Sequence, residues 1–259
     1  MVLVVSWNVH CVPVAGGCPK HHVRDVAKYA SRLVDQYDAQ VLVLNEIFLP
    51  RVREAILSKL RSRSKRAWNM TPIANATGVK PLVGSGVVIA WRDDLRKAGS
   101  MHEVTYQTCC QFDCLSHKGG LQLPLTDAEG HRFHVLGTHM QAWEIPLVCG
   151  GVRNQQARTL GEMVSKLEHS GHVLPNEPVL LAGDFNEKHS EGMETRLGAK
   201  HVQCAGGCKT HARGELDHFY LRGGTSASCE KLSFRAVSVP GTRNPSDHAP
   251  IVTEMRFAM

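Results

Sequence analysis

The chain has 259 residues, of which 42% are hydrophobic and 21% charged, so it can build a substantial core and is not expected to be disordered. Its formal net charge of +6 suits an anionic partner, either a nucleic acid or an acidic membrane surface, and does not choose between the two. No apolar run approaches the ~20 residues that a membrane-spanning helix needs, so no transmembrane segment is expected.

Short apolar runs predict a series of β-strands, several of them buried on both faces. In chain order they cover 2–6, 41–44, 83–91, 133–138, 179–182, 216–221 and 249–253. Apolar residues at helical spacing predict helices over 23–37 and 152–167, and Pro50 marks the start of a third helix over 51–60. Strands that alternate with helices and hairpin-like pairs indicate a layered α/β architecture. No linker or repeat divides the chain, so a single domain over 1–259 is expected.

The N-terminus and the cysteines indicate the cellular compartment in which the protein is expected to lie. The chain begins with a strand-like apolar run rather than the basic region of a signal peptide, which favours a cytoplasmic or peripheral membrane protein, or a trimmed catalytic domain. The nine cysteines cannot pair completely, and the crowding of Cys109, Cys110 and Cys114 suits free thiols or a local redox pair better than a disulfide scaffold. We therefore expect a reducing compartment.

Four predicted strands end in residues that can bind a metal ion or a phosphate ester. Asn8 follows the first of these strands, and Glu46 follows the second. Phosphodiester hydrolysis needs an attacking water, a base, and positive charge opposite the phosphoryl oxygens. A hard cation such as Mg²⁺ prefers oxygen ligands and commonly takes one or two protein carboxylates. Glu46 is therefore the candidate principal metal ligand, with Asn8 as a neutral companion. The alternatives are an ordinary strand-end carboxylate and a turn residue.

The motif Gly183-Asp184-Phe185-Asn186 follows the predicted strand over 179–182. Side-chain alternation is expected to place Asp184 and Asn186 on one side and Phe185 in the core. Gly183 would allow the backbone to approach a ligand closely. Asp184 can orient the attacking water or a metal-bound water, and the Asn186 amide can donate to a phosphate oxygen. The alternative is an Asx turn that closes the strand.

The motif Ser246-Asp247-His248 supplies the candidate general base, His248, because imidazole titrates near neutral pH. Neighbours in an extended segment point in opposite directions, so Asp247 is expected to reach a metal or its waters rather than to orient His248. Asp217, at the start of the strand over 216–221, is the candidate carboxylate that holds the imidazole; a solvent-facing strand residue is the alternative. Its neighbour His218 points away and is expected to be structural.

His139 follows the predicted strand over 133–138. A histidine here can contact the phosphate or stabilise charge on the departing oxygen, and a buried core histidine is the alternative. Taken in chain order, these motifs cover nearly the whole sequence and resemble the endonuclease/exonuclease/phosphatase superfamily. The resemblance implies a four-layer α/β sandwich of two packed mixed β-sheets flanked by helices. It also implies phosphate ester cleavage that depends on Mg²⁺, with Mn²⁺ as a substitute.

Three features are similar to the neutral sphingomyelinase branch of this superfamily. They are His139-Met140-Gln141-Ala142 with Cys149-Gly150 and Val152-Arg153 after it, Asn45-Glu46-Ile47-Phe48, and the run from Asp113 to Gly119. The resemblance implies that Asp113 and Lys118 pair as a switch that gates the site; an ordinary hairpin turn with an exposed charge pair is the alternative. The implied partner is sphingomyelin or a related choline phospholipid at a membrane surface.

The sequence departs from this branch in features that bear on access to lipid. It has no obvious exposed aromatic hairpin of the kind that secreted bacterial members insert into membranes, and no membrane-anchoring N-terminal region. Trp143, just after the His139 motif, is interpreted either as an interfacial residue or as a packed one.

A second group of residues has zinc-like spacing: His201, Cys204, Cys208 and His211. Thiolate and imidazole suit Zn²⁺, but the two ligand pairs lie closer together than in known zinc motifs. A flexible loop on the substrate side is therefore the expected interpretation.

We expect a Mg²⁺-dependent phosphodiesterase that resembles neutral sphingomyelinase and splits sphingomyelin into ceramide and phosphocholine. A Mg²⁺-dependent DNA or RNA endonuclease or exonuclease of the same superfamily is the alternative with the same chemistry. Its main support is the basic stretch 59–66, which is either an anionic docking patch or a solvated helix end. A catalytically inactive binding protein is opposed by the presence of Glu46, Asp184 and His248.

Overall fold

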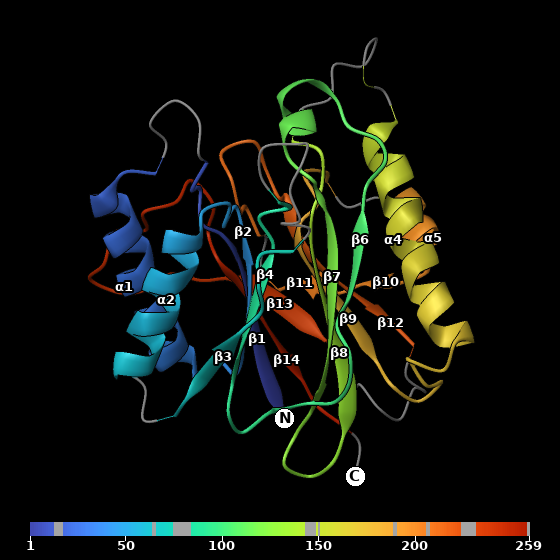
Figure 1. Cartoon of the computed structure of the whole chain (residues 1–259), viewed down its shortest axis with the longest axis horizontal. Coiled ribbons are helices and arrows are strands. Elements are labelled where there is room, and N and C mark those ends of the chain that lie inside the picture. The colour runs from blue at the N-terminus through green and yellow to red at the C-terminus, as the bar shows by residue number, and fades with distance from the viewer. Residues whose placement is uncertain are drawn as a thin grey trace.

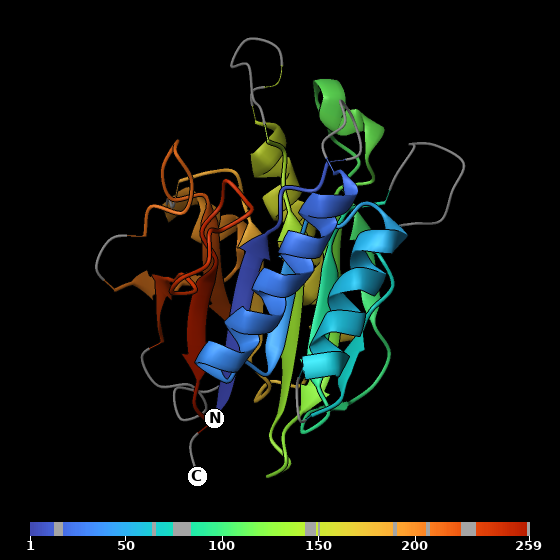
Figure 2. The ribbon, with the colours of Figure 1, turned by 90° about the vertical axis from the view of Figure 1, so that its left-hand side faces the viewer.

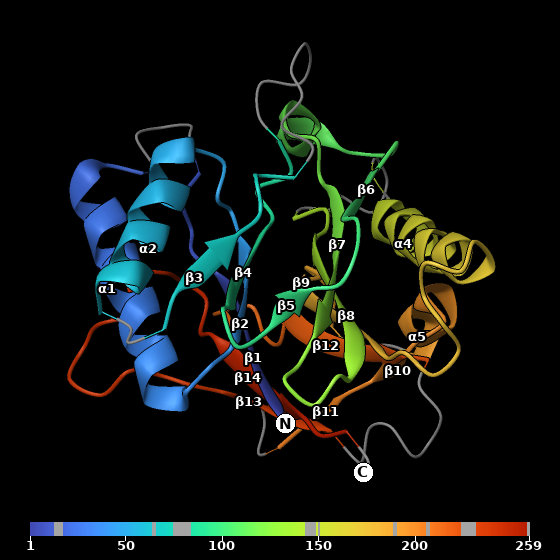
Figure 3. The ribbon, with the colours of Figure 1, turned by 60° about the horizontal axis from the view of Figure 1, so that its bottom comes forward.

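Two β-sheets pack face to face at the centre of the molecule, and helices cover the outer face of each sheet (Figures 1 and 3). The computed structural model describes residues 1–12, 18–63, 66–74, 84–142, 149, 151–188, 191–205, 208–223 and 232–257. Both sheets contain parallel and antiparallel pairs. The expected four-layer α/β sandwich is thus confirmed.

The first sheet has seven strands within the described residues. From edge to edge they are β11 (Gln203–Cys204), β13 (Ser233–Ala236), β14 (Ile251–Met255), β1 (Val2–Asn8), β2 (Val41–Asn45), β4 (Val88–Arg92) and β3 (Trp68–Met70). Alternate side chains of its central strands face opposite layers. Val5 and Leu42 pack in the core beneath the helices, whereas Val4 and Val43 pack against the second sheet. Burial on both faces explains the continuous apolar runs.

The second sheet also has seven strands in the described part of the chain. They are β10 (Lys200–His201), β12 (Asp217–Arg222), β9 (Val179–Asp184), β8 (Arg132–His139), β7 (Gly119–Thr126) and β5 (Arg96–Lys97) in that order, with β6 (His102–Thr105) also paired to β7. Strands β8 and β9 are parallel, and β12 runs antiparallel to β9. The end of β9 therefore lies beside the start of β12.

The helices form the two outer layers (Figures 1 and 2). The first sheet is covered by α1 (Lys20–Tyr37) and α2 (Pro50–Arg63), and the second by α4 (Val152–His169) and α5 (Glu191–Leu197). A short 3-10 helix, η1 (Gln111–Leu115), precedes β7. None of the described helices combines the length and hydrophobicity needed to cross a bilayer.

Strand β7 was not predicted from the sequence, because two glycines and a proline in Gly119–Thr126 argue against a strand interior. The structure explains one of these glycines. A Cβ atom on Gly120 would lie 2.5 Å from a terminal methyl group of Leu160 of α4, so a larger residue would require that side chain to move. The short strands β3, β5, β6, β10, β11 and β13 were also missed, as was α5.

The cysteines contradict the expectation of free thiols. The eight cysteines among the described residues form four disulfides, Cys11–Cys18, Cys109–Cys114, Cys110–Cys149 and Cys204–Cys208. Their Cα–Cα distances, from 4.9 to 6.0 Å, fall in the usual range for disulfides. Only Cys229 lies outside the described residues. Disulfides are typical of oxidising environments, which removes the basis for expecting a reducing compartment.

Candidate active site

Several strands of both sheets end at one edge of the sandwich, the upper edge in Figure 1. Polar side chains from the two sheets meet there. The register of the strands brings them there. Asn8 at the end of β1 pairs with Asn45 at the end of β2. In the second sheet, Asp184 at the end of β9 lies between His139 of β8 and Asp217 of β12. Strand ends that are distant in sequence thus face one another across the two sheets.

Asn8 joins the two sheets at this edge. Its amide nitrogen donates to Glu46 Oε1 over 3.1 Å and to Asp184 Oδ2 over 3.0 Å. Asn45, whose importance the sequence did not reveal, makes a second link. Its side chain donates to the carbonyl of Thr138 and accepts the N–H of Asp184. The bonds of Asn8 thus hold the carboxylates of Glu46 and Asp184 on either side of its side-chain amide.

The carboxylate of Glu46 has the properties of a cation ligand. Glu46 adopts a positive φ of 62°, a conformation that few residues with side chains take up and that often marks functional sites. Among the described residues, its Oε2 atom is buried and has no hydrogen-bond partner. A buried carboxylate oxygen without a donor is costly unless a positive charge lies nearby. Oxygen donors of this kind fit a hard divalent cation.

His248 is held from several sides. Its Nδ1 lies 2.7 Å from Asp217 Oδ2, and its Nε2 lies 3.7 Å from Asp184 Oδ2. The carbonyl of His248 accepts the indole N–H of Trp7, which fixes the backbone against β1. Asp217 is fully buried, and its N–H donates to the hydroxyl of Thr210. The imidazole is thus oriented by one carboxylate and faces a second.

The buried charges of this site shift one another's pKa values. Burial, followed by the negative charge of Asp217, raises the pKa of Asp184 to about 7. Burial alone would lower the pKa of His248, but the charge and hydrogen bond of Asp217, together with the charge of Asp184, outweigh it and raise the pKa to about 9. Both pKa values are thus raised, and strongly shifted values of this kind are typical of sites that move protons.

His139 and Lys118 form a separate arm of the site. The ammonium group of Lys118 donates to His139 Nε2 over 3.1 Å and to the carbonyl of Met140 over 2.7 Å, and it lies 2.9 Å from Asp113 Oδ2. Asp113 also accepts the N–H of Ala142. Burial, and then the positive charges of Lys118 and His248, lower the pKa of His139 well below its ordinary value. Its ring is therefore neutral near pH 7.

Asn186 lies at the turn that ends β9. Its N–H donates to Asp184 Oδ1 over 2.8 Å, so the turn has the Asx geometry that was the structural alternative, and its amide nitrogen donates to the carbonyl of Met140. Phe185 is fully buried, as expected. A Cβ atom on Gly183 would lie 2.0 Å from the carbonyl oxygen of Thr138, so this glycine is needed for β8 to approach β9.

Asp247 lies on the outer side of His248. It is about half-exposed, and its two carboxylate oxygens each lie 3.4 Å from a histidine, His10 on one side and His211 on the other. The sequence did not single out His10 as a site residue. Its position two residues after Asn8 could have indicated that it lies near the site. In the structure, the backbone N–H of His10 donates to the Asn8 side chain.

The family model described as the Endonuclease/Exonuclease/phosphatase family matches residues 5–248. The chain belongs to this family. By family it is therefore a phosphodiesterase-type hydrolase. The match covers each of the strand ends described above, and the fold and the order of the motifs agree with the resemblance seen in the sequence.

Relatives of the chain within the family include bacterial sphingomyelinases. The chain is 28% identical to a Leptospira interrogans protein named sphingomyelinase C over 158 residues, which cover 56% of this chain and 27% of the relative. The chain thus spans about a quarter of that relative's length. A Staphylococcus aureus beta toxin mutant with bound magnesium ions matches with a TM-score of 0.75 at 19% identity, covering 100% and 99% of the two chains. Streptomyces griseocarneus sphingomyelinase C gives 0.74 at 17% identity with the same coverage. These likenesses in structure show the shared fold.

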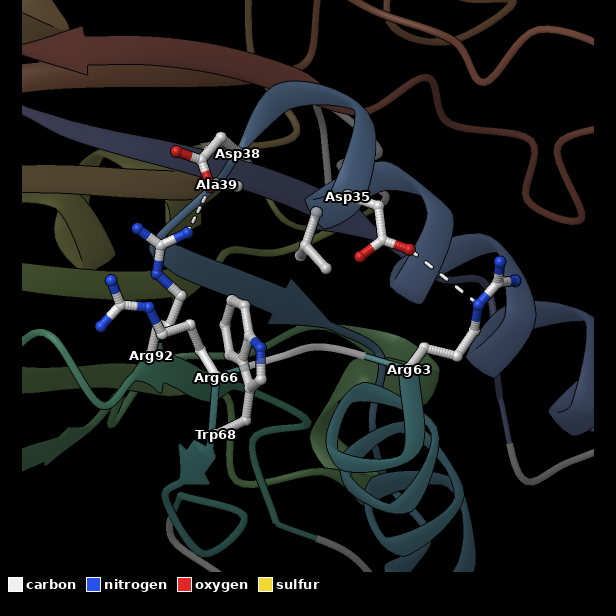
Figure 4. A pocket seen from close by; sticks show the side chains of 8 residues that line it. Asp35, Asp38, Ala39, Arg63, Arg66, Trp68 and Arg92 are labelled. Atoms are coloured by element: carbon white, nitrogen blue, oxygen red, sulfur yellow. Dashed lines mark hydrogen bonds and ion pairs between the residues drawn. The ribbon is translucent and has the colours of Figure 1, made fainter.

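The basic stretch 59–66 is in part described by the structure. Its residues 59–63 form the end of α2, which lies away from the active-site edge at the top of Figure 1. A pocket of about 420 Å³ lies beside it (Figure 4). Arg63 faces Asp35 there and Arg92 pairs with Asp38, so acidic side chains offset part of the positive charge.

Two further expectations concern neighbouring segments. Trp143 lies outside the described residues. The zinc-like group is divided by the fold: Cys204 and Cys208 form a disulfide, and His211 faces Asp247. These four residues therefore do not form one metal site.

Proposed function

We propose that the chain is a single catalytic domain that hydrolyses sphingomyelin to ceramide and phosphocholine with the help of Mg²⁺. The observation that carries the proposal is the 2.7 Å hydrogen bond between His248 and Asp217, with the second ring nitrogen of His248 facing Asp184. A base oriented in this way, next to a buried carboxylate cluster, suits the activation of water. Relatives named sphingomyelinase C support the choice of substrate.

The cation would be held by Glu46, with Asn8 as a companion and Asp247 on the outer side. The unpartnered Glu46 Oε2 supports this assignment, as does the beta toxin structure with bound magnesium ions. When bound, Mg²⁺, or Mn²⁺ in its place, would screen charge on the phosphoryl and leaving oxygens and favour the neutral form of His248 by offsetting nearby carboxylate charge.

The side chains divide the reaction among them. His248 Nε2 takes a proton from water while the water oxygen attacks phosphorus, and the bond from phosphorus to the ceramide oxygen breaks. Asp217 stabilises the imidazolium that forms, in the manner of a buried carboxylate that holds a catalytic histidine. Asp184 positions the water. Asn186 and His139 contact the phosphoryl oxygens, where donated hydrogen bonds count most in the transition state.

Two exposed apolar side chains support a lipid surface as the partner. Phe112 is 86% exposed and Leu115 is 43% exposed, both on η1. Asp113 of the same helix contacts Ala142 and Lys118, so η1 is attached to the His139 arm of the site. Exposed aromatic and aliphatic groups insert readily into the interfacial layer of a membrane. This pair would bring the active-site edge against the lipid headgroups.

Asp113 and Lys118 are proposed to gate the site. The resemblance to membrane-associated neutral sphingomyelinases suggests the pairing, and the 2.9 Å ion pair supports it. Because Lys118 also donates to His139, a movement of Asp113 would change the charge next to a residue that contacts the phosphate.

A parallel assay tests the choice of substrate. The chain is incubated with Mg²⁺ and with sphingomyelin vesicles, supercoiled plasmid or abasic-site DNA. Phosphocholine release with intact DNA is the expected result. Cleavage of DNA without phosphocholine release would show that the chain is a nuclease of the same family, and the net charge of +6 makes that the relevant competitor.

A further inference from the structure

A group of three potential metal ligands lies outside the active site, and the function described above does not use it. It consists of His201 in β10, Glu215 just before β12, and His218 in β12, and is called the outer cluster below. His218 follows Asp217 directly, but its side chain points to the opposite face of the sheet. There it packs near Phe185 and Tyr220, in the core beneath α4 and α5.

Two of the three separations within the outer cluster match those of ligands around one tetrahedral ion. His201 Nε2 lies 3.1 Å from His218 Nδ1, which in turn lies 3.4 Å from Glu215 Oε1. All three ligand atoms lie within 4.8 Å of one another. Zinc bound at 2.0–2.1 Å in a tetrahedron places neighbouring ligand atoms roughly 3.3 Å apart. The first two separations are therefore close to those of ligands around a common Zn²⁺.

The hydrogen bond of His218 provides an independent observation. Its Nε2 lies 2.9 Å from the carbonyl oxygen of Glu187, an acceptor, so this nitrogen carries the proton. The lone pair of the neutral ring is then on Nδ1, which points into the outer cluster. A ring nitrogen that donates to a backbone carbonyl while the other faces the ion is the usual arrangement of a metal-bound histidine.

The chemistry of the ligands distinguishes this cluster from the proposed magnesium site. Two imidazoles and one carboxylate form a set that Zn²⁺ prefers over Mg²⁺, which favours oxygen ligands alone. The side chain of Glu215 is 29% exposed, so water can reach the remaining position. Cys204 and Cys208 are joined to each other and do not supply the fourth ligand.

We propose that His201, Glu215 and His218 bind one Zn²⁺ per chain, with water as the fourth ligand. The ion would tie the edge strand β10 to the segment that leads into β12. That segment is also held by Thr210, whose hydroxyl accepts hydrogen bonds from the N–H groups of Leu216 and Asp217. The ion would stiffen the chain next to Asp217 without contacting the substrate.

Metal content provides the test. The oxidised protein is loaded with Zn²⁺, dialysed against zinc-free buffer and measured by mass spectrometry of the elements. About one zinc per chain is expected for the wild type, and a loss of most of it in His201→Gln and in Glu215→Gln. Added Zn²⁺ should raise the Tm of the wild type and leave that of His201→Gln unchanged. His218→Gln is avoided as the primary variant because the ring is fully buried.

Three matched variants separate this site from its competitors. Cys204→Ser/Cys208→Ser, His211→Gln and Glu46→Gln should each retain the zinc. Loss of zinc in the cysteine variant would assign the ion to the thiols. Loss of zinc in His211→Gln would place it beside His211 and Asp247, and loss in Glu46→Gln would place it in the magnesium site. Each of these results would overturn the proposal. If the wild type bound no zinc, the proposal would be wrong, and the cluster would be explained by the hydrogen bond between His201 and His218. None of these outcomes depends on hydrolytic activity.

Discussion

The active-site edge and the outer cluster meet at neighbouring residues of β12, yet they are built differently. Asp217 faces the space where both sheets contribute side chains, and its partners come from strand ends spread over the whole chain. His218 faces the helix layer, and its cluster draws only on the chain between β10 and β12. The first site is therefore coupled to the packing of the entire sandwich, whereas the second depends on one sheet edge. Substitutions can separate the two.

Apart from loss of the base His248 itself, the largest effect is expected from a comparison of two carboxylates at the active-site edge. Glu46→Gln should lower turnover of sphingomyelin about 10²–10³-fold, because it removes the charge opposite the cation while keeping the shape of the side chain. Asp247→Asn, at the more exposed position, should cost less than about tenfold. Phosphocholine release at saturating Mg²⁺ measures both. Equal losses would mean that the cation lies nearer to Asp247 than proposed.

Asp217→Asn should affect proton transfer and stability together. Without this carboxylate, the pKa of His248 falls from about 9 towards its ordinary value, so the rise of activity with pH should begin at lower pH.

A raised histidine pKa contributes stability that is complete below about pH 6.5 and is lost as the pH rises through about 9. Urea unfolding of the metal-free protein should therefore depend less on pH in Asp217→Asn than in the wild type. An unchanged pH dependence would show that Asp217 does not set the charge of His248.

The ion pair of Asp113 and Lys118 should have an intermediate effect. Lys118→Met and Asp113→Asn are each expected to lower activity about tenfold, and the double variant no further, because each change breaks the same pair. Lys166→Met, at the end of α4, serves as the control for removal of a lysine. Additive losses would argue against a gate formed by the pair.

The smallest effect is expected at the exposed apolar pair on η1. Phe112→Ser/Leu115→Ser should lower the rate on sphingomyelin vesicles several-fold and leave the rate on a water-soluble phosphodiester unchanged, because only membrane contact is weakened. Leu174→Ser is the matched control, since Leu174 is similarly exposed at 44% but lies between α4 and β9. Equal losses on both substrates would place the pair in the catalytic machinery rather than at a membrane.

The same contrast explains what could be predicted from the sequence. Asp184 and Glu46 follow strands that are buried on both faces, so their strand-end positions were visible in the apolar pattern. Two other features depend on side-chain geometry that a linear pattern does not contain. One is the contact of Lys118, the partner of Asp113, with His139, and the other is the link that Asn45 makes between the sheets.

The outer cluster and the disulfides were beyond this kind of inference. His201 was considered only together with Cys204, Cys208 and His211, because these four are close in sequence, and a loop was the expected interpretation. Its actual neighbour, His218, is set by the antiparallel pairing of β10 with β12. The cysteines were interpreted as free thiols or a local redox pair from their odd number and from the crowding of Cys109, Cys110 and Cys114. Disulfide partners such as Cys110 and Cys149 are instead brought together by tertiary structure.

The turnover of sphingomyelin vesicles by His248→Gln tests the central claim most directly. The substitution keeps a polar side chain of similar size but removes the base that accepts the proton from water. With Mg²⁺ present and with the Tm close to that of the wild type, phosphocholine release should fall about 10²–10⁴-fold. A His248→Gln protein that still released phosphocholine at close to the wild-type rate would contradict the account.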